Sequence, residues 1–307
     1  MKAQETGRMA IKNVNSIVNF IILTVIVFLI AFAGYALWDS AQIYNAADKS
    51  NYTAFKPTAS AEEGKSFEEL QIINPDVIAW LSVYGTNIDY PVTQGADNIK
   101  YINTDAEGNY SLSGAIFLDY RNRRDFRDFN SILYGHHMEK NAMFGEIGGF
   151  VDRNKFDSHL YGNLYYENKD YGIEFFAFIQ TDAYDSSTFK PNIKQENRQE
   201  YLDDLLAKAL HQRDINVSAS DRLILLSTCS LDSTNGRDIL VGRITDTVFD
   251  DPYKTNDTNR HPLFNFIKSI PWWVLALLFA LFMTLLIYLK KRKRSLTSAN
   301  PTLFHPF

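Results

Sequence analysis

The sequence predicts a mainly β domain between two membrane-spanning helices. Two long uncharged apolar segments lie near the ends of the chain, and short apolar or alternating runs fill the region between them. Of the 307 residues, 46% are hydrophobic and 22% are charged, as in ordinary folded proteins rather than disordered ones. Each part of this prediction depends on a separate pattern.

Both apolar segments are long enough to cross a bilayer as a helix. The first covers 17–38 and contains no charged residue, and the second covers 271–289 and begins Pro271-Trp272-Trp273. Each has about the 20 residues that a membrane helix needs. A core helix of this length would normally show a polar face, which both segments lack. We therefore expect two transmembrane helices.

The first segment could instead be a cleaved signal peptide, but its apolar core is longer than usual and no clear cleavage site ends it. Basic residues flank both segments on the side of the chain ends: Lys2, Arg8, Lys12, Lys290, Lys291, Arg292, Lys293 and Arg294. Positive charge of this kind stays in the cytoplasm. We expect cytoplasmic segments at 1–16 and 290–307 and an extracellular region between the spans.

The extracellular region is acidic. Without those eight basic residues and Glu5, 23 Lys and Arg remain against 35 Asp and Glu, a formal charge near −12. Phosphate binding needs the opposite sign, so the charge argues against a nucleic-acid partner. A single cysteine allows no disulfide within the chain, so the domain must depend on its own core.

The extracellular region divides by composition into three parts. Residues 39–65 are small and polar and predict a spacer that can include some helix. The regular elements lie in 66–248, and a polar, turn-rich linker follows over 249–270. At the start of the domain, Ser66 is placed to cap a short helix over 66–72.

Eight short runs in the domain have the pattern of strands: 77–84, 88–92, 115–118, 131–134, 164–166, 173–180, 223–227 and 239–244. An amphipathic helix over 197–211 interrupts them, with Tyr201, Leu205, Leu206 and Leu210 on one stripe. A shorter helix is expected near 141–150. Many short strands between turn residues predict a closed, mostly antiparallel barrel, or a sandwich.

Cys229 is the first candidate catalytic residue. It follows the apolar run 223–226 and the pair Ser227-Thr228, where a buried strand emerges. A free cysteine is often simply a buried packing residue. The polar stretch after it favours an accessible thiol, which could act as a nucleophile.

His136 is the second candidate and follows the predicted strand 131–134. A histidine can act as a general acid and base, although a lone one is often only a surface residue. The neighbouring His137 raises the alternative of a metal site. Consecutive strand residues point to opposite faces, and no nearby residues complete a zinc set. We expect no metal and no other cofactor.

Arg237 is the third candidate. It lies eight positions after Cys229, at the start of the last predicted strand, so a hairpin-like return would bring it beside the cysteine. Arg243 competes, but it lies six residues deeper along the same strand. Either arginine could instead be an ordinary exposed charge.

Together these residues match a known constellation. The segment 226–229, Leu-Ser-Thr-Cys, followed by Arg237 resembles the signature of the sortases, and Gly135-His136 resembles their histidine strand. The resemblance is closest to class B sortases, over 74–80, 85–92, 114–122, 134–138 and the helix 197–211. It covers about 67–246, nearly the whole predicted domain.

The resemblance implies an eight-stranded β-barrel with peripheral helices that acts as a cysteine transpeptidase. Cys229 would be the nucleophile, His136 its acid and base, and Arg237 the clamp of the transition state, with Ser227 and Thr228 lining the substrate site. The substrate would be an exported protein with a C-terminal sorting signal, and the acceptor an amine of peptidoglycan or its precursor. Such an enzyme would lie in the plasma membrane of a Gram-positive-type bacterium with its catalytic domain outside.

A C-terminal span is commoner in pilus-building class C enzymes, so a pilin polymerase that uses a pilin lysine is an alternative. Those enzymes carry an Asp-Pro-aromatic lid before the barrel, which 39–67 lacks. The segment Asp251-Pro252-Tyr253 matches this pattern, but it lies after the barrel and is interpreted as linker. A catalytically inactive membrane-held scaffold is the alternative from another class. A sorted substrate is a third, but no Pro-x-Thr-Gly-like pentapeptide precedes Pro271.

Overall fold

The computed structural model describes residues 2–57, 66–230 and 234–254. The folded unit is Ala41–Thr255, and the helix before it belongs to a second unit, so each is described by itself. The predicted second span 271–289 and the tail 290–307 lie outside the described residues, as do the end of the predicted spacer and most of the linker.

The chain begins with one long helix, α1, over Lys2–Ala46. Its segment Ile21–Ala46 has a mean hydropathy of 2.5, and its hydrophobic window is not buried in the protein. By length and composition this segment is sufficient to cross a bilayer. The predicted N-terminal apolar helix is therefore confirmed.

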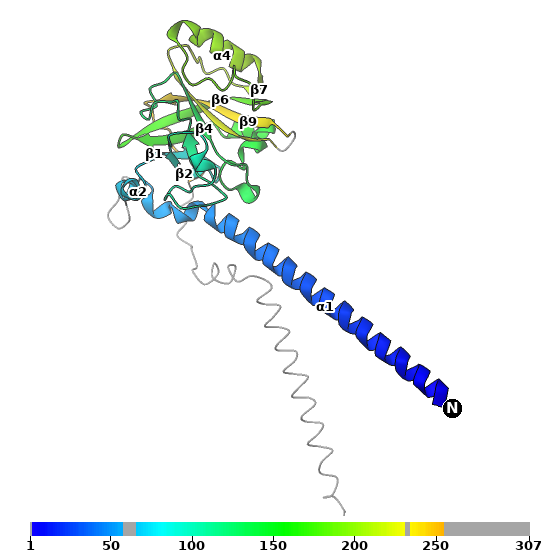
Figure 1. Ribbon diagram of the computed structural model, residues 1–307. Helices are drawn as coiled ribbons and strands as arrows, with labels where there is room; N and C mark the ends of the chain where they lie inside the picture. Colours follow the sequence, from blue (N-terminus) through cyan, green and yellow to red (C-terminus); the bar gives the residue numbers. More distant parts are fainter. Residues whose placement is uncertain (1, 58–65, 231–233, 255–307) are drawn as a thin grey trace, which may run out of the picture. The chain divides into compact units, whose positions relative to one another are not determined.

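The folded unit is a β-barrel (Figure 1). Its strands are β1 Val77–Val83, β2 Asp89–Thr93, β3 Ile116–Leu118, β4 Asn130–Tyr134, β5 Tyr161–Tyr166, β6 Lys169–Asp182, β7 Ala209–Gln212, β8 Arg222–Cys229 and β9 Gly236–Thr245. They follow the order β5-β1-β2-β3-β4-β8-β9-β6-β7, and a further pairing of β5 with β6 closes a ring of eight. The predicted eight-stranded barrel is confirmed, with β7 added outside the ring.

Two of the pairings are parallel: β2 with β3, and β4 with β8. The others are antiparallel. In the β4–β8 ladder, Tyr134 lies opposite Ser227. This parallel pair brings the ends of two strands that are distant in sequence to the same edge of the barrel.

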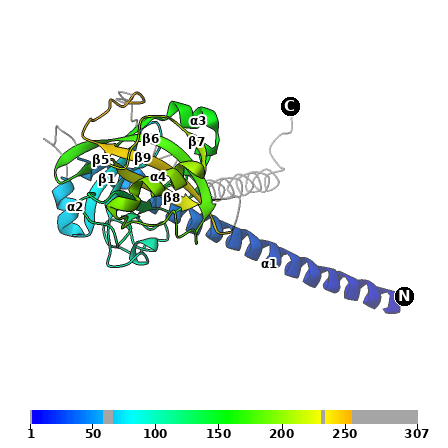
Figure 2. The same ribbon diagram turned by 90° about the horizontal axis from the view of Figure 1, so that it is seen from above.

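Short helices surround the strands. They are α2 Phe67–Ile73, α3 Arg153–Ser158, α4 Arg198–Ala207 and the 3-10 turns η1 Lys49–Asn51, η2 Thr53–Phe55, η3 Lys100–Ile102, η4 Glu139–Asn141, η5 Ile147–Val151 and η6 Gln195–Asn197. Ser66 caps α2 by accepting from the Glu69 amide, as the sequence predicted. Figure 2, viewed from above, shows α4 lying over the strands of the barrel.

Side chains of β4, β8 and β9 alternate between two hydrophobic clusters. Leu133, Leu226 and Leu240 belong to the large cluster that the barrel encloses. Their neighbours in sequence belong to a second cluster, formed with residues of α4 on the outer face; they are Ile132, Leu225 and Ile239. Alternate residues of a strand share a face, so the residues two and four positions after Leu225 also lie on the outer face.

The helix predicted over 197–211 is shorter in the structure. It ends at Ala207, and Ala209–Gln212 forms β7, which pairs with β6. Strand pairing outweighs the helical pattern there. The helix expected near 141–150 is also wrong, because that stretch holds only 3-10 turns, with the α-helix α3 following at Arg153–Ser158. The pair Gly148-Gly149 disfavours an α-helix in this stretch.

The segments before and after the barrel pack against it. Tyr52 and Phe55 are buried with the large cluster, and Lys56 forms a 2.7 Å ion pair with Asp89, where the sequence predicted a spacer. After β9, Phe249 stacks on Tyr161 with 4.0 Å between ring centroids. The described start of the predicted linker is thus part of the folded unit.

Candidate active site

Cys229 and Arg237 lie opposite each other at the ends of two paired strands. Cys229 ends β8, Arg237 is the second residue of β9, and the antiparallel register pairs them directly. Directly opposed residues of an antiparallel pair project to the same face. Cys229 lies four positions after Leu225, and Arg237 lies two positions before Ile239. Both therefore lie on the outer face of the barrel. The Cys229 side chain is exposed there.

His136 reaches the same edge from β4. It lies just beyond Tyr134, the last residue of that strand. The connecting Gly135 donates its amide to the Ser227 carbonyl at 3.2 Å, and Thr228 Oγ1 donates to the Gly135 carbonyl at 2.9 Å. The histidine segment is therefore bonded directly to the strand that carries the cysteine.

Gly135 is required by packing rather than by its backbone angles. A Cβ atom at this position would lie 2.7 Å from the ring of Phe144, which is closer than real Cβ contacts. Phe144 is fully buried and has little room to move. The glycine thus allows the chain to pass close to the core just before His136.

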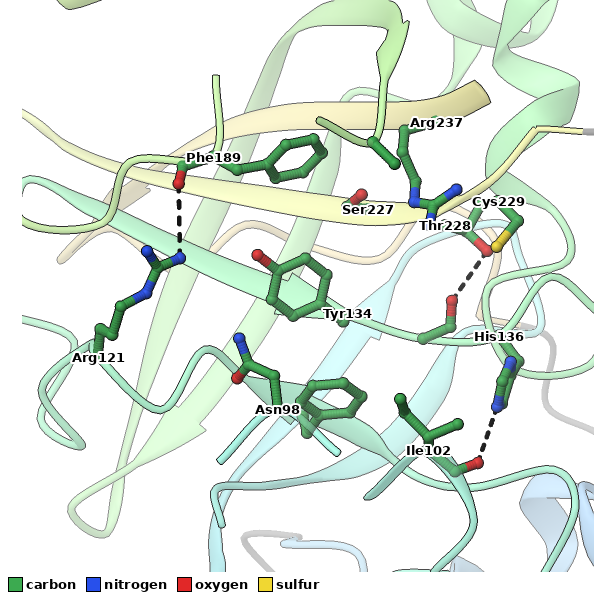
Figure 3. Close-up of a pocket in the computed structure, with 13 residues that line it drawn as sticks. Asn98, Ile102, Arg121, Tyr134, His136, Phe189, Ser227, Thr228, Cys229 and Arg237 are labelled. Atoms are coloured by element: carbon green, nitrogen blue, oxygen red, sulfur yellow. Dashed lines mark hydrogen bonds between the residues drawn. The ribbon is translucent and has the colours of Figure 1, made fainter. Parts of the chain in front are cut away.

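One open cavity of about 390 Å³ joins these residues. Figure 3 shows Cys229, His136 and Arg237 grouped at one end of it, with Arg121 and Asn98 at the other and Tyr134 between. Its lining comprises Asn98, Ile102, Phe117, Arg121, Tyr134, Gly135, His136, Ala183, Phe189, Ser227, Thr228, Cys229 and Arg237. All five residues that the sequence singled out therefore meet at one cavity.

The contacts of His136 fix its ring. Its Nε2 lies 2.8 Å from the carbonyl oxygen of Ile102. A carbonyl only accepts, so Nε2 carries the hydrogen and Nδ1 is left as the second ring nitrogen. In Figure 3 this second nitrogen lies on the side of Cys229. The ring is thus oriented for Nδ1 to exchange a proton near the thiol.

Arg237 and Ser227 differ in their hydrogen bonds. Arg237 Nη1 donates to the neighbouring carbonyl of Gly236 at 2.9 Å, so most of its guanidinium donors are not used by that bond. Ser227 is 1% exposed, and its hydroxyl has no hydrogen-bond partner in the described part of the chain. A buried hydroxyl without a partner is uncommon and costs free energy. The Arg237 guanidinium therefore has donors left for a peptide in the cavity, whereas the Ser227 hydroxyl is buried.

The two competing residues lie elsewhere. His137 is not part of the lining, and it forms an isolated bridge with Met143. Arg243 bonds to Glu174 at 2.6 Å across β9 and β6, so it is a paired strand charge. Among the residues that the structure describes, no group of three His, Cys, Asp or Glu is arranged to hold a metal.

Sequence reasoning missed the other end of the cavity. Arg121 lies in a stretch that contributed to the family resemblance, and Tyr134 ends a predicted strand, but neither was singled out. Asn98 and Phe189 lie in irregular segments and carry no pattern that would identify them. Their place in the cavity depends on loops whose course the sequence does not reveal.

Comparison with known proteins gives consistent relatives, although no protein-family model matches the chain. Sortase B of Staphylococcus aureus (strain NCTC 8325 / PS 47) is 32% identical over 182 residues, which are 58% of this chain and 74% of that protein. Sortase B of Listeria monocytogenes serovar 1/2a (strain ATCC BAA-679 / EGD-e) is 32% identical over 204 residues, 64% of this chain and 81% of that protein.

Solved structures of similar proteins agree. Sortase B from the type II pilus of Streptococcus pneumoniae is 50% identical, with a TM-score of 0.53 over 59% of this chain and 99% of that one. A Staphylococcus aureus sortase B–substrate complex is 31% identical, with a TM-score of 0.54 over 58% and 83%. A sortase B complexed with triglycine is 27% identical, with a TM-score of 0.56 over 68% and 98%.

Proposed function

Because the chain belongs to the class B sortase family and is a sortase-type cysteine transpeptidase, we propose that it cleaves the C-terminal sorting signal of exported proteins and joins them to an amine of the cell wall. The observation that carries this proposal is the cross-strand pair of Cys229 and Arg237, with His136 on the same cavity. A nucleophile, a proton carrier and a cation within one open groove can together perform acyl transfer.

In the first half-reaction, the Cys229 thiolate attacks the carbonyl carbon of the sorting-signal threonine. Arg237 donates hydrogen bonds to the oxyanion that forms, where charge stabilisation contributes most. The C–N bond then breaks, and protonated His136 gives its proton from Nδ1 to the departing amine. The product is a thioester between the exported protein and Cys229. The bond from Nε2 to Ile102 keeps the other nitrogen free for this transfer.

In the second half-reaction, an incoming amine attacks the thioester and loses a proton to His136. The C–S bond breaks, the Cys229 thiolate leaves, and a new amide remains. Ser227 would line the cavity that holds the bound peptide, with its hydroxyl buried. Thr228 bonds to the Gly135 carbonyl, so it would act by holding the histidine segment in place.

The acceptor amine distinguishes wall anchoring from pilus building. A similar sortase B has been crystallised with triglycine, which resembles an amine-ended peptide acceptor, while another comes from a pilus system. We place the wall amine first and a pilin lysine second. Incubating the acyl-enzyme with triglycine and, separately, with a pilin that offers a lysine would distinguish the two by the mass of the product.

The N-terminal apolar helix supports membrane anchoring. We further propose that 271–289 spans the membrane as well, so that both ends of the chain are cytoplasmic, because basic residues flank both segments. Tags at residues 1 and 307 should then resist protease added to intact protoplasts, and a tag within 39–65 should be cleaved. Cleavage of either terminal tag would contradict this topology.

The decisive experiment for the function is the trapping of the acyl-enzyme. The full-length enzyme, incubated with a sorting-signal peptide and no amine, should gain the mass of the acyl fragment on Cys229. The Cys229→Ala variant should gain none and should not cleave the peptide. An active Cys229→Ala variant would end the transpeptidase proposal, and an inactive wild type would favour the scaffold alternative.

A further inference from the structure

The end of the cavity that faces away from Cys229 is organised by one buried carboxylate. Asp119 lies directly after β3, and its side chain is 0% exposed. It does not line the cavity itself. Its contacts, however, reach three of the residues that do, each from a different segment of the chain.

Asp119 accepts hydrogen bonds from all three. Arg121 binds it with two parallel bonds, Nε to Oδ1 at 2.9 Å and Nη2 to Oδ2 at 2.8 Å. Asn98 Nδ2 donates to Oδ2 at 3.0 Å, and the Tyr134 hydroxyl donates to Oδ2 at 3.1 Å. Two-bond arginine–carboxylate pairs are the most directional ion pairs in proteins. One carboxylate thus fixes the orientation of three side chains that line the cavity.

The charge state of this cluster is well defined. Burial alone would raise the pKa of Asp119, but the Arg121 guanidinium and the bond from Asn98 outweigh burial and lower it. Burial raises the pKa of Tyr134, and the Asp119 charge raises it further, so its phenol stays protonated and donates. The cluster is therefore a carboxylate surrounded by donors, which satisfies a buried charge that would otherwise be costly.

The Asp119 carboxylate also accepts the Arg121 backbone amide at Oδ1, at 2.9 Å, but most bonds that hold the surrounding loop do not use it. The Asp119 amide donates to the Ile132 carbonyl at 2.8 Å, and the Asp119 carbonyl accepts from Gln94 Nε2 at 2.9 Å. Gln94 also donates to the Asn122 carbonyl at 2.7 Å. The loop thus keeps three backbone supports without the carboxylate, whose remaining bonds orient side chains.

The cluster also extends to the opposite wall. Arg121 Nη2 lies 3.5 Å from the carbonyl oxygen of Phe189, and the Phe189 ring lies 6.2 Å from that of Tyr134. Figure 3 shows these groups around the groove end away from Cys229. Losing the carboxylate would therefore free the side chains of Asn98, Arg121 and Tyr134. It would also weaken the contact of Arg121 with Phe189.

We propose that Asp119 is a positioning residue for substrate binding: it holds Asn98, Arg121 and Tyr134 in the orientation that receives the substrate peptide, without touching the peptide. This inference rests on the proposed function for the nature of the peptide. It predicts a loss of peptide affinity with little change in the chemistry at Cys229, since that end of the groove has its own supports.

The test uses full-length enzyme and fluorescent peptides with Pro-Xaa-Thr-Gly and Pro-Xaa-Thr-Asn cores. In the Cys229→Ala background, Asp119→Asn should weaken binding of the best peptide at least tenfold by fluorescence polarisation. In the Cys229 enzyme it should raise KM tenfold with less than a threefold change in kcat. Alkylation of Cys229 by iodoacetamide should change less than twofold, since that reagent needs no groove.

Asp89→Asn is the matched control. Asp89 is a partly buried carboxylate with an ion pair and two further side-chain donors, and it lies outside the cavity. This variant should lower the melting temperature and leave Kd and KM unchanged. The proposal is overturned if Asp119→Asn leaves Kd and KM unchanged. It is also overturned if Asp119→Asn lowers kcat and the rate of alkylation instead of weakening binding. If Asp119→Asn does not fold, Arg121→Lys decides: unchanged binding with that variant overturns the proposal.

Binding and cleavage are measured separately so that the two proposals can fail separately. Peptide that binds and responds to Asp119→Asn, but is never cleaved by the wild type, supports the positioning role and contradicts the transpeptidase function. Cleavage by the wild type that Asp119→Asn does not affect supports the transpeptidase function and contradicts the positioning role. Absence of any peptide binding contradicts both.

Discussion

Cys229 and Arg237 are direct partners in the β8–β9 ladder, and their side chains share the outer face of the barrel. Because the ladder fixes both backbones, their separation is set by strand pairing rather than by a loop. The backbone that carries the proposed oxyanion donor is thus in place before substrate arrives, as electrostatic catalysis favours.

The first prediction compares two arginines of one strand. Arg237→Ala should lower kcat/KM by about 10²–10³, the usual loss for an oxyanion donor. Arg243→Ala should retain kcat/KM because its side chain pairs with Glu174 away from the cavity. That variant should melt at a lower temperature, since Glu174 loses its partner. Steady-state kinetics and thermal unfolding of both variants check this, and the opposite pattern would mean that the proposed roles are reversed.

The second prediction concerns the adjacent histidines. His136→Ala should lower kcat/KM at least about a hundredfold, as expected for removing a general acid. His137→Ala should cost little activity, because His137 does not line the cavity. The measurement is peptide cleavage at equal concentrations of folded enzyme. Comparable losses in both variants would indicate that the histidine segment, rather than one ring, is what matters.

The third prediction concerns stability at acid pH. Burial alone would raise the pKa of Asp89, but Lys56 and bonds from Trp80 and Ser82 outweigh it and lower the pKa. A carboxylate with a lowered folded-state pKa stabilises the protein above its unfolded pKa of about 3.9, and this contribution is lost as pH falls through the folded pKa. Asp89→Asn should therefore cost about 2 kcal/mol at pH 7, the scale of bonds to a charged group.

The difference in free energy of unfolding between wild type and Asp89→Asn should shrink below about pH 4. Urea unfolding from pH 7 to pH 3 measures it. Asp246→Asn is the control, because its carboxylate is 79% exposed and its ion pair with Lys169 is long at 3.4 Å. A difference for Asp89→Asn that grows as pH falls would contradict the assignment.

The fourth prediction tests the segment before the barrel. Phe55 is 2% exposed and packs in the large cluster, so Phe55→Ala should cost about 3–5 kcal/mol, as for a buried ring elsewhere. Tyr184→Ala is a suitable control because that ring is 82% exposed. Chemical unfolding of both variants provides the comparison. A loss below about 1 kcal/mol for Phe55→Ala would support the spacer that the sequence suggested.

The sequence predicted the barrel well because each of its eight strands is a short apolar or alternating run between turn residues. It predicted the meeting of Cys229 and Arg237 for a related reason: they lie at the facing ends of consecutive strands. The strand β7 was missed because Leu210 continues the helical stripe of α4, and only pairing with β6 decides otherwise. Such pairing is a tertiary effect that local pattern does not contain.

The remaining failures have the same physical origin. Tyr52 and Phe55 are single aromatic residues in a polar stretch, and their burial depends on where the barrel places a hollow for them. Asn98 and Phe189 reach the cavity through irregular loops. Asp119 was part of a stretch that resembled a family, but its role became visible only when its three partners were found around one carboxylate.

The parallel pairing of β4 with β8 also has a consequence for how the protein becomes active. It brings together Gly135 and Thr228, which are 93 positions apart in the chain. Contacts between such distant residues form slowly, because a long loop must close before any of them is made. The strand β8 must insert between β4 and β9 for His136 to meet Cys229 and Arg237. A newly made chain therefore carries all three residues before they meet, and we expect its activity to begin only when the barrel closes.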